Sequence, residues 1–159
     1  MSRLFDTKRS DEPSSASGVR ERAEAFDKAF ADDEELDEES RRLSERLKDA
    51  SAVSPIRYER HRKPGTRWLI EHARVANDYV FQLHPLRPIQ VPSSDVIAAL
   101  IATMDQVYPR SIQIFYRPPN DQLGVNFYTV TAQGAAGVPG WEEASRRALD
   151  ALSDINVWG

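Results

Sequence analysis

Hydrophobic and polar residues alternate most regularly in SIQIFYRPPNDQLGVNFYTV, residues 111–130. Alternation with a period of two is typical of β-strands. The Pro-Pro-Asn-Asp sequence in the middle interrupts it with residues that favour turns. The pattern therefore predicts a β-hairpin of two short antiparallel strands.

This alternation also assigns the hairpin side chains to two faces. One face is apolar and sets Ile112, Ile114 and Tyr116 opposite Leu123, Val125 and Phe127. The other mixes polar and aromatic groups and sets Gln113, Phe115 and Arg117 opposite Asn126 and Tyr128. Three explanations of the second face stay open: a cover from the chain's own helices, a protein partner, or nucleic-acid bases stacked on the two aromatic rings.

Helical periodicity marks two segments on either side of the hairpin. SSDVIAALIATMDQVYP, residues 93–109, is apolar around most of a helix and predicts a central, buried helix that Pro109 ends. WEEASRRALDALSD, residues 141–154, predicts a last helix with two acids in its first turn. The final INVWG is a candidate for a short strand at the sheet edge.

The segment TRWLIEHARVANDYVFQL, residues 66–83, fits two interpretations. A helix would place Leu69, His72, Tyr79 and Leu83 on one face, and two strands would turn around Ala76-Asn77-Asp78. Because β-branched residues are sparse here, the helix is favoured.

The N-terminal third is polar and acidic. Residues 1–50 hold 15 acids and 10 bases, a net charge of -5, whereas residues 51–159 hold 10 acids and 11 bases. We expect a disordered tail over residues 1–18 and two helices over 19–31 and 33–50, separated by the acidic run DDEELDEE. Each helix has a narrow apolar stripe, so the helices either dock on their own domain or bind a partner, with Phe26 and Phe30 as anchors.

The predicted fold class is therefore α+β. A small domain over residues 55–159 would hold two helices, an antiparallel hairpin with an optional third short strand, and a C-terminal helix. A charged helical extension over residues 19–54 and the tail of residues 1–18 would precede it.

One basic cluster, RYERHRKPGTR, lies at residues 57–67 and holds Arg57, Arg60, Arg62, Lys63 and Arg67. It fits a solvated connector that pairs with the neighbouring acidic run. It also fits a contact with phosphates or with an acidic protein surface.

Motifs for catalysis or cofactor binding are missing from the sequence. His61, His72 and His84 fit no metal spacing, and no P-loop or Gly-x-Ser-x-Gly turn occurs. In a helix, His72 would lie on an apolar stripe as a core residue, and His84, before Pro85, would be a cap or loop residue. We therefore expect no enzyme activity, no metal and no cofactor.

The sequence also has no cysteine and no apolar run long enough to span a membrane, so we expect a cytoplasmic protein without membrane contact. The function predicted is a non-catalytic adaptor that binds unidentified protein partners and that could form a homo-oligomer. Its partner-binding residues would be Phe115, Arg117, Asn126, Tyr128, Phe26, Phe30 and Trp158. The alternative is a nucleic-acid-binding protein that uses the basic cluster with the hairpin aromatics.

Overall fold

The computed structural model describes residues 14–52, 54–108, 112–119 and 126–158, with side chains described from residue 32 onward. The chain divides into two units, residues 1–35 and 36–159. The sequence prediction divided it after residues 18 and 54, whereas the second unit begins at Leu36, inside a helix.

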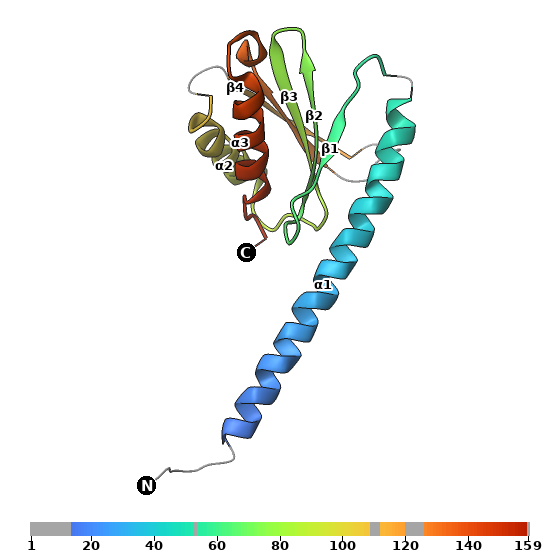
Figure 1. The fold of residues 1–159 in the computed structure, drawn as a ribbon, viewed down its shortest axis with the longest axis vertical. Helices are drawn as coiled ribbons and strands as arrows, with labels where there is room; N and C mark the ends of the chain where they lie inside the picture. The colour runs from blue at the N-terminus through green and yellow to red at the C-terminus, as the bar shows by residue number, and fades with distance from the viewer. Residues whose placement is uncertain (1–13, 53, 109–111, 120–125, 159) are drawn as a thin grey trace. The chain divides into compact units, whose positions relative to one another are not determined.

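The described residues form a mixed α+β fold, as predicted (Figure 1). The elements, in chain order, are α1 Ser14–Ser51, β1 Glu59–His61, β2 Trp68–Val75, β3 Asp78–Pro85, α2 Ser93–Asp105, β4 Ile112–Arg117, β5 Phe127–Ala132, the 3-10 turn η1 Ala135–Gly137, and α3 Trp141–Ser153.

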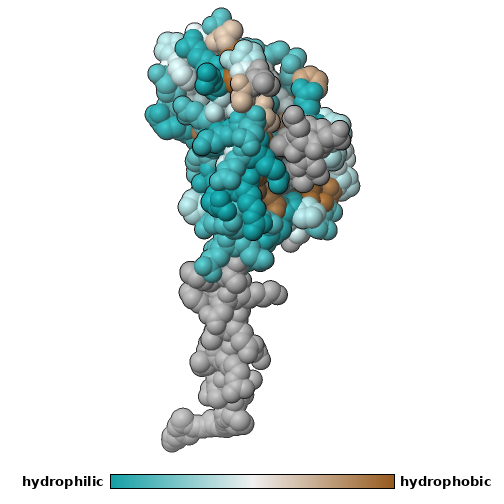
Figure 2. All heavy atoms as spheres, turned by 90° about the vertical axis from the view of Figure 1, so that its right-hand side faces the viewer, coloured by the Kyte–Doolittle hydropathy of each residue, from teal (hydrophilic) through white to brown (hydrophobic). Residues whose placement is uncertain are grey.

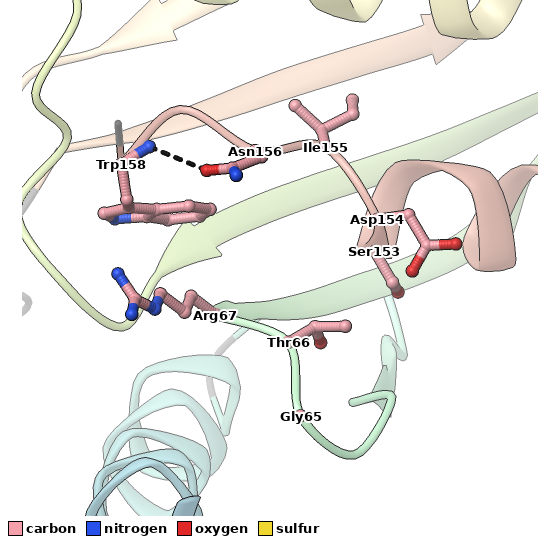
Figure 3. A pocket seen from close by; sticks show the side chains of 8 residues that line it. All are labelled: Gly65, Thr66, Arg67, Ser153, Asp154, Ile155, Asn156 and Trp158. Atoms are coloured by element: carbon pink, nitrogen blue, oxygen red, sulfur yellow. Dashed lines mark hydrogen bonds between the residues drawn. The ribbon is translucent and has the colours of Figure 1, made fainter. Parts of the chain in front are cut away.

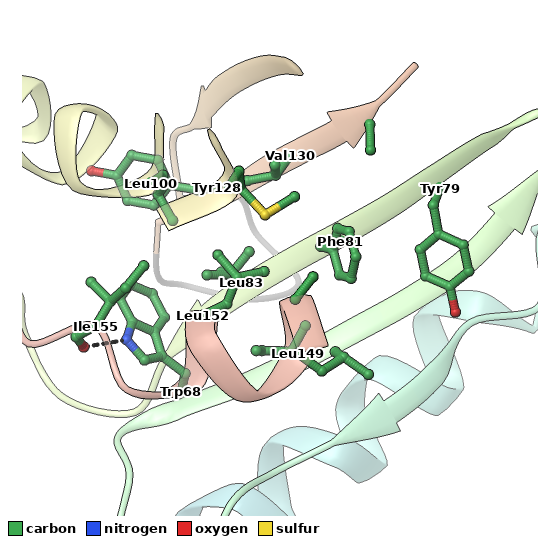
Figure 4. Close-up of a cluster of buried hydrophobic side chains, with 14 of the residues drawn as sticks. Trp68, Tyr79, Phe81, Leu83, Leu100, Tyr128, Val130, Leu149, Leu152 and Ile155 are labelled. Carbon is green, nitrogen blue, oxygen red and sulfur yellow. Dashed lines mark hydrogen bonds between the residues drawn. The ribbon is translucent and has the colours of Figure 1, made fainter. Parts of the chain in front are cut away.

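The five strands form one antiparallel sheet in the order β1-β2-β3-β5-β4. Helices α2 and α3 cover its first face and enclose the main core (Figure 4). This core takes buried side chains from β2, β3, β5 and both helices, among them Trp68, Phe81, Leu83, Leu100, Tyr128 and Leu152. The buried Trp68 indole also donates a 2.9 Å hydrogen bond to the Ile155 carbonyl, which ties the chain's C-terminal segment to the core.

The second half of α1 covers part of the second face. Leu36, Leu43 and Leu47 follow one another along one side of the helix and pack with Leu69 of β2 and Leu86. Burying a Leu side chain stabilises a fold by about 1.5–3 kcal/mol, so this narrow stripe is enough to dock the helix. The opposite side of this half-helix is hydrophilic, and the face of the molecule that carries it shows few apolar residues (Figure 2).

The helix favoured over residues 66–83 is wrong, and the two-strand interpretation is correct. β2 and β3 pair along their full length around a tight turn in which Ala76 has a φ of 55°. The physical reason is burial on both faces: every residue from Trp68 to Ala73 is buried. A strand covered on both faces loses the alternation of polar and apolar residues that a sequence pattern detects.

The two helices predicted at 19–31 and 33–50 form one helix, Ser14–Ser51. The acidic run between them contains no Gly or Pro, so nothing in it breaks a helix. Residues 14–18 of the predicted tail are helical, and the rest of that tail lies outside the described residues. The predicted strand after α3 does not form, although the Gln90 amide donates to the Val157 carbonyl there.

The hairpin is confirmed, but its register differs from the predicted one. Tyr116 lies opposite Tyr128 and Ile114 lies opposite Val130, so Tyr128 shares the core face. The prediction paired even-numbered residues of the first strand with odd-numbered residues of the second. A slip of one residue moves every side chain of a strand to the other face. The positions of Leu123 and Val125 lie outside the described residues.

We expect Tyr128→Ala to lower the free energy of unfolding by about 3–5 kcal/mol, because it empties a site that is 1% exposed. Phe115→Ala, at a side chain 49% exposed, should cost less than about 1 kcal/mol. Urea unfolding of both variants checks this register. Equal costs at the two positions would contradict it.

His72 lies on the core face of β2, where it shares a 2.9 Å hydrogen bond with the Tyr79 hydroxyl. Burial lowers the pKa of His72 below its ordinary value, and the nearby Glu59 carboxylate opposes that shift. Between the lowered folded pKa and the ordinary unfolded pKa, the unfolded chain binds more protons than the folded one. Stability must therefore rise with pH across this interval.

The free energy of unfolding should accordingly fall as the pH drops below about 6.5, the ordinary His value. Burial lowers the pKa of His61 as well, so His72→Asn should remove part of this pH dependence and not all of it. Urea midpoints of wild type and variant between about pH 7.5 and 5 measure the difference. Parallel curves for the two proteins would show that His72 does not contribute.

Candidate functional site

Phe115 and Arg117 lie together on the second face of the sheet. The Phe115 ring is 49% exposed, and the Arg117 guanidinium lies 5.5 Å from the centre of that ring. Arg117 also donates through Nε to the Thr129 hydroxyl at 3.3 Å. We call the exposed part of this face, formed by Gln113, Phe115 and Arg117 of β4, the open face.

Other predicted partner-binding residues lie elsewhere. Tyr128 belongs to the core, where its ring packs edge-on against Tyr116 at 5.4 Å. Asn126 is half-buried directly before β5. Phe26 and Phe30 lie within α1, at positions whose side chains are outside the described residues. Among the residues predicted to bind a partner on the hairpin, Phe115 and Arg117 therefore lie on the open face, whereas Tyr128 and Asn126 do not.

Trp158 packs into its own domain. Its ring lies edge-on to Trp68 at 5.0 Å, and its indole N–H donates to the Arg87 carbonyl at 3.1 Å. The ring also forms one side of a hollow of about 370 Å3 that the side chain of Arg67 approaches from below in Figure 3. Several polar groups around this hollow already have partners. The Ser153 hydroxyl donates to the Leu149 carbonyl, and the Asn156 side-chain oxygen accepts from the Trp158 amide.

Most of the predicted basic cluster is engaged in intramolecular contacts. Arg62 pairs with Asp37 of α1, within the acidic run, and Lys63 pairs with Asp150 and Asp154 at 2.9 Å each. The Arg67 guanidinium lies 5.9 Å from the Trp158 ring centre. Arg57 is exposed, and the Arg60 guanidinium lies 3.5 Å from the Glu71 carboxylate of β2. The predicted pairing between this cluster and the acidic run is present in the structure.

Sequence reasoning missed a buried polar cluster on the second face, made of Arg60, Glu71 and His84. Glu71 is 3% exposed and His84 is fully buried. Both point to this face because they alternate with the core residues Ile70 and Leu83 along β2 and β3. The prediction of His84 as a cap or loop residue is wrong. Pro85 ends β3 and is tolerated there, so it does not exclude His84 from the strand.

The cluster is linked by hydrogen bonding and charge. His84 Nε2 donates to Glu71 Oε1 at 3.1 Å, and Arg60 lies 3.5 Å from Oε2 of the same carboxylate. The Phe127 ring stacks on the His84 ring with centres 4.8 Å apart. His84 Nδ1 is buried and has no hydrogen-bond partner among the described residues. An unsatisfied buried acceptor costs about 1–3 kcal/mol, so this nitrogen needs an explanation.

A hollow of about 150 Å3 lies beside this cluster, at the end of α1. We call it the His84 hollow, and its lining residues are Leu47, Ala50, Ser51, Ser54, Tyr58, Glu71, Gln82, His84 and Phe127. Gln82 donates to the Tyr58 hydroxyl at 3.3 Å. Burial raises the pKa of Tyr58, the Glu71 carboxylate raises it further, and Arg117 lowers it. Because Arg117 is the register partner of Phe127, the hollow adjoins the open face.

The cluster and the hollow offer three features that could bind a ligand. These are the His84 Nδ1 nitrogen without a hydrogen-bond partner, the Glu71 carboxylate paired with Arg60, and the apolar walls of the hollow. No group of three or more His, Asp or Glu side chains within the described ranges could hold a metal ion. A two-strand reading of residues 66–83 would have found the cluster, since it places Glu71 and His84 on the face opposite Ile70 and Leu83.

Comparisons of the chain with models of protein families, with curated proteins and with solved structures found no match. Among the helices that the structure describes, none is long and apolar enough to cross a membrane. The open face and the His84 hollow are therefore the features from which a function can be inferred.

Glu71→Ala should destabilise the protein by about 3 kcal/mol, because it leaves the largely buried Arg60 without its counter-charge and His84 without its acceptor. Glu38→Ala is the matched control, since Glu38 pairs with Arg41 on the exposed side of α1. Thermal unfolding should show a lower midpoint for the first variant and an unchanged one for the second. Similar midpoints for both variants would mean that the buried polar cluster does not contribute to the stability of the protein.

Proposed function

We propose that this chain is a protein-interaction module that binds an acidic, partly apolar segment of another protein on the open face. The observation that carries the proposal is the half-exposed Phe115 ring beneath the Arg117 guanidinium. Aromatic and Arg side chains are the types enriched at binding hot spots. The module would act by binding alone, without chemistry of its own.

The part of the second face that α1 covers indicates which kind of partner segment would fit the open face. There the chain's own helix α1 supplies Leu side chains to the sheet and acids to the surrounding bases, with Asp37 on Arg62 and Glu39 on Arg87. The open face repeats this combination, since Phe115 is apolar and Arg117 is cationic. A partner segment with apolar and acidic residues would match it as α1 matches the covered half.

The edge position of β4 supports an extended conformation for that segment. β4 is the last strand of the sheet, and no strand of the described chain pairs with its outer side. Its first five residues, Ile112–Tyr116, contain neither Pro nor a charged side chain, the usual devices that protect an edge. A partner strand could hydrogen-bond to this edge and place alternate side chains on Phe115 and Arg117.

The ion pairs of the basic cluster favour a protein partner over nucleic acid. Arg60, Arg62 and Lys63 each have an acidic side chain of this chain within ion-pair distance. Phosphate binding would have to displace those acids. Stacking of bases on Tyr128 would also require a ring that is 1% exposed. We retain the cytoplasm as the proposed location, and self-association as a form of the same function.

The proposal predicts that Phe115→Ala combined with Arg117→Ala removes partner capture and leaves folding intact. Immobilised wild-type protein would be exposed to lysate of the native source, and the retained proteins would be quantified by mass spectrometry. Ile101→Ala is the matched control, because Ile101 is also 49% exposed but lies on α2. Supporting proteins are those that wild type and control retain and that the double variant loses by at least about tenfold, a binding loss of about 1.4 kcal/mol.

The captured proteins should contain an acidic segment that, as a synthetic peptide, competes for wild-type protein. Retention of the same proteins by the double variant would refute the open face as the site. Light scattering of the purified protein tests whether a second copy of this chain binds the open face. A dimer that Phe115→Ala dissociates would assign the open face to self-association.

A further inference from the structure

From the buried polar cluster and the space beside it, we infer that the His84 hollow is a binding site for a small uncharged aromatic molecule carrying a hydroxyl group. His84 Nδ1 accepts the ligand's hydrogen bond in this site. The inference is independent of the proposed partner binding, since it concerns a different group of residues and a different class of ligand.

The hydrogen-bonding state of His84 defines what the ligand must offer. A carboxylate can only accept, so the 3.1 Å contact with Glu71 assigns the donating N–H to Nε2 of His84. In the neutral ring the other nitrogen, Nδ1, is then an acceptor. This acceptor is fully buried and has no partner within the described part of the chain. The complementary ligand therefore carries a donor.

The charges of the cluster exclude an ionic ligand. Arg60 and Glu71 already form an ion pair at 3.5 Å, and both side chains are largely buried. An additional buried cation or anion would have no counter-charge and would lose its hydration. A hydroxyl group provides the missing donor without this cost.

The walls of the hollow define the body of the ligand. Leu47 and Ala50 of α1 and the Phe127 ring provide apolar surface, and the Phe127 ring already stacks on His84. The volume is about 150 Å3, below that of sites for drug-sized ligands. An engineered apolar cavity of about this size holds a benzene molecule. One aromatic ring with one hydroxyl group is the matching size and polarity.

The test uses phenol and toluene as probes, because they have nearly the same shape and only phenol has a donor. Each is titrated into the full-length 15N-labelled protein, and the ring nitrogens of His84 are followed by NMR. We expect phenol to bind with a dissociation constant of about 1 mM or lower and to shift the Nδ1 resonance. Toluene should bind at least about tenfold more weakly.

His84→Gln provides the matched variant. Its side-chain amide can keep a donor for Glu71 near the position of Nε2, but it has no acceptor at the position of Nδ1. The preference for phenol over toluene should disappear in this variant and persist in Gln113→Ala, on the open face. Phe115→Ala should also keep the preference, which separates this site from the proposed partner surface.

Two results would overturn the inference. Equal affinities for phenol and toluene would show that the hollow selects no donor. Unchanged His84 ring resonances at about 10 mM phenol would show that only solvent occupies it. Both readings come from the wild-type protein, so they hold even where His84→Gln does not fold.

Discussion

Coverage of both faces of the central strands is the constraint on which the rest of this structure depends. β2 and β3 lie inside the sheet, and a strand there presents side chains to both sides. Helices α2 and α3 cover the first face completely enough to build the main core. The second face has only the second half of α1, whose Leu stripe meets Leu69 and Leu86. One narrow helix cannot cover a five-stranded sheet, and the open face is the part that α1 leaves uncovered.

The second half of α1 covers only part of the second face, and this explains where the polar groups of that face lie. Beneath α1 the sheet is shielded from water, so Glu71 and His84 are acceptable there only as a bonded pair with Arg60 nearby. At the end of α1 the cover stops, and the His84 hollow forms between the helix and Phe127. Beyond the hollow the same face is open, and Phe115 reaches solvent under Arg117. The cluster, the hollow and the open face are therefore consecutive regions of one incompletely covered surface.

Acidic residues of the N-terminal third take part in the docking of α1 on the sheet. Acids of α1 contact Arg62 and Arg87, so charge complements the apolar stripe in docking the half-helix. At exposed positions such pairs contribute at most about 1 kcal/mol each, so the Leu contacts dominate the energy. The Leu stripe therefore determines which face of α1 meets the sheet, and the ion pairs flank it. Arg60, Arg62 and Lys63 of the basic cluster are paired with acids of the same chain, and Arg117 is the cation of the open face.

The sequence by itself determined the mixed α+β class, the helices near residues 93–109 and 141–154, and the existence of the hairpin, because each has a local pattern of period 3.6 or 2. It also determined that Phe115 and Arg117 share a face, since they belong to one strand. Tertiary structure decided that residues 66–83 are strands, because burial on both faces removes the alternation. It decided that Tyr128 is core, because register depends on a partner strand beyond a loop. It also joined Glu71 and His84, 13 positions apart, whose relation becomes visible only when β2 and β3 pair.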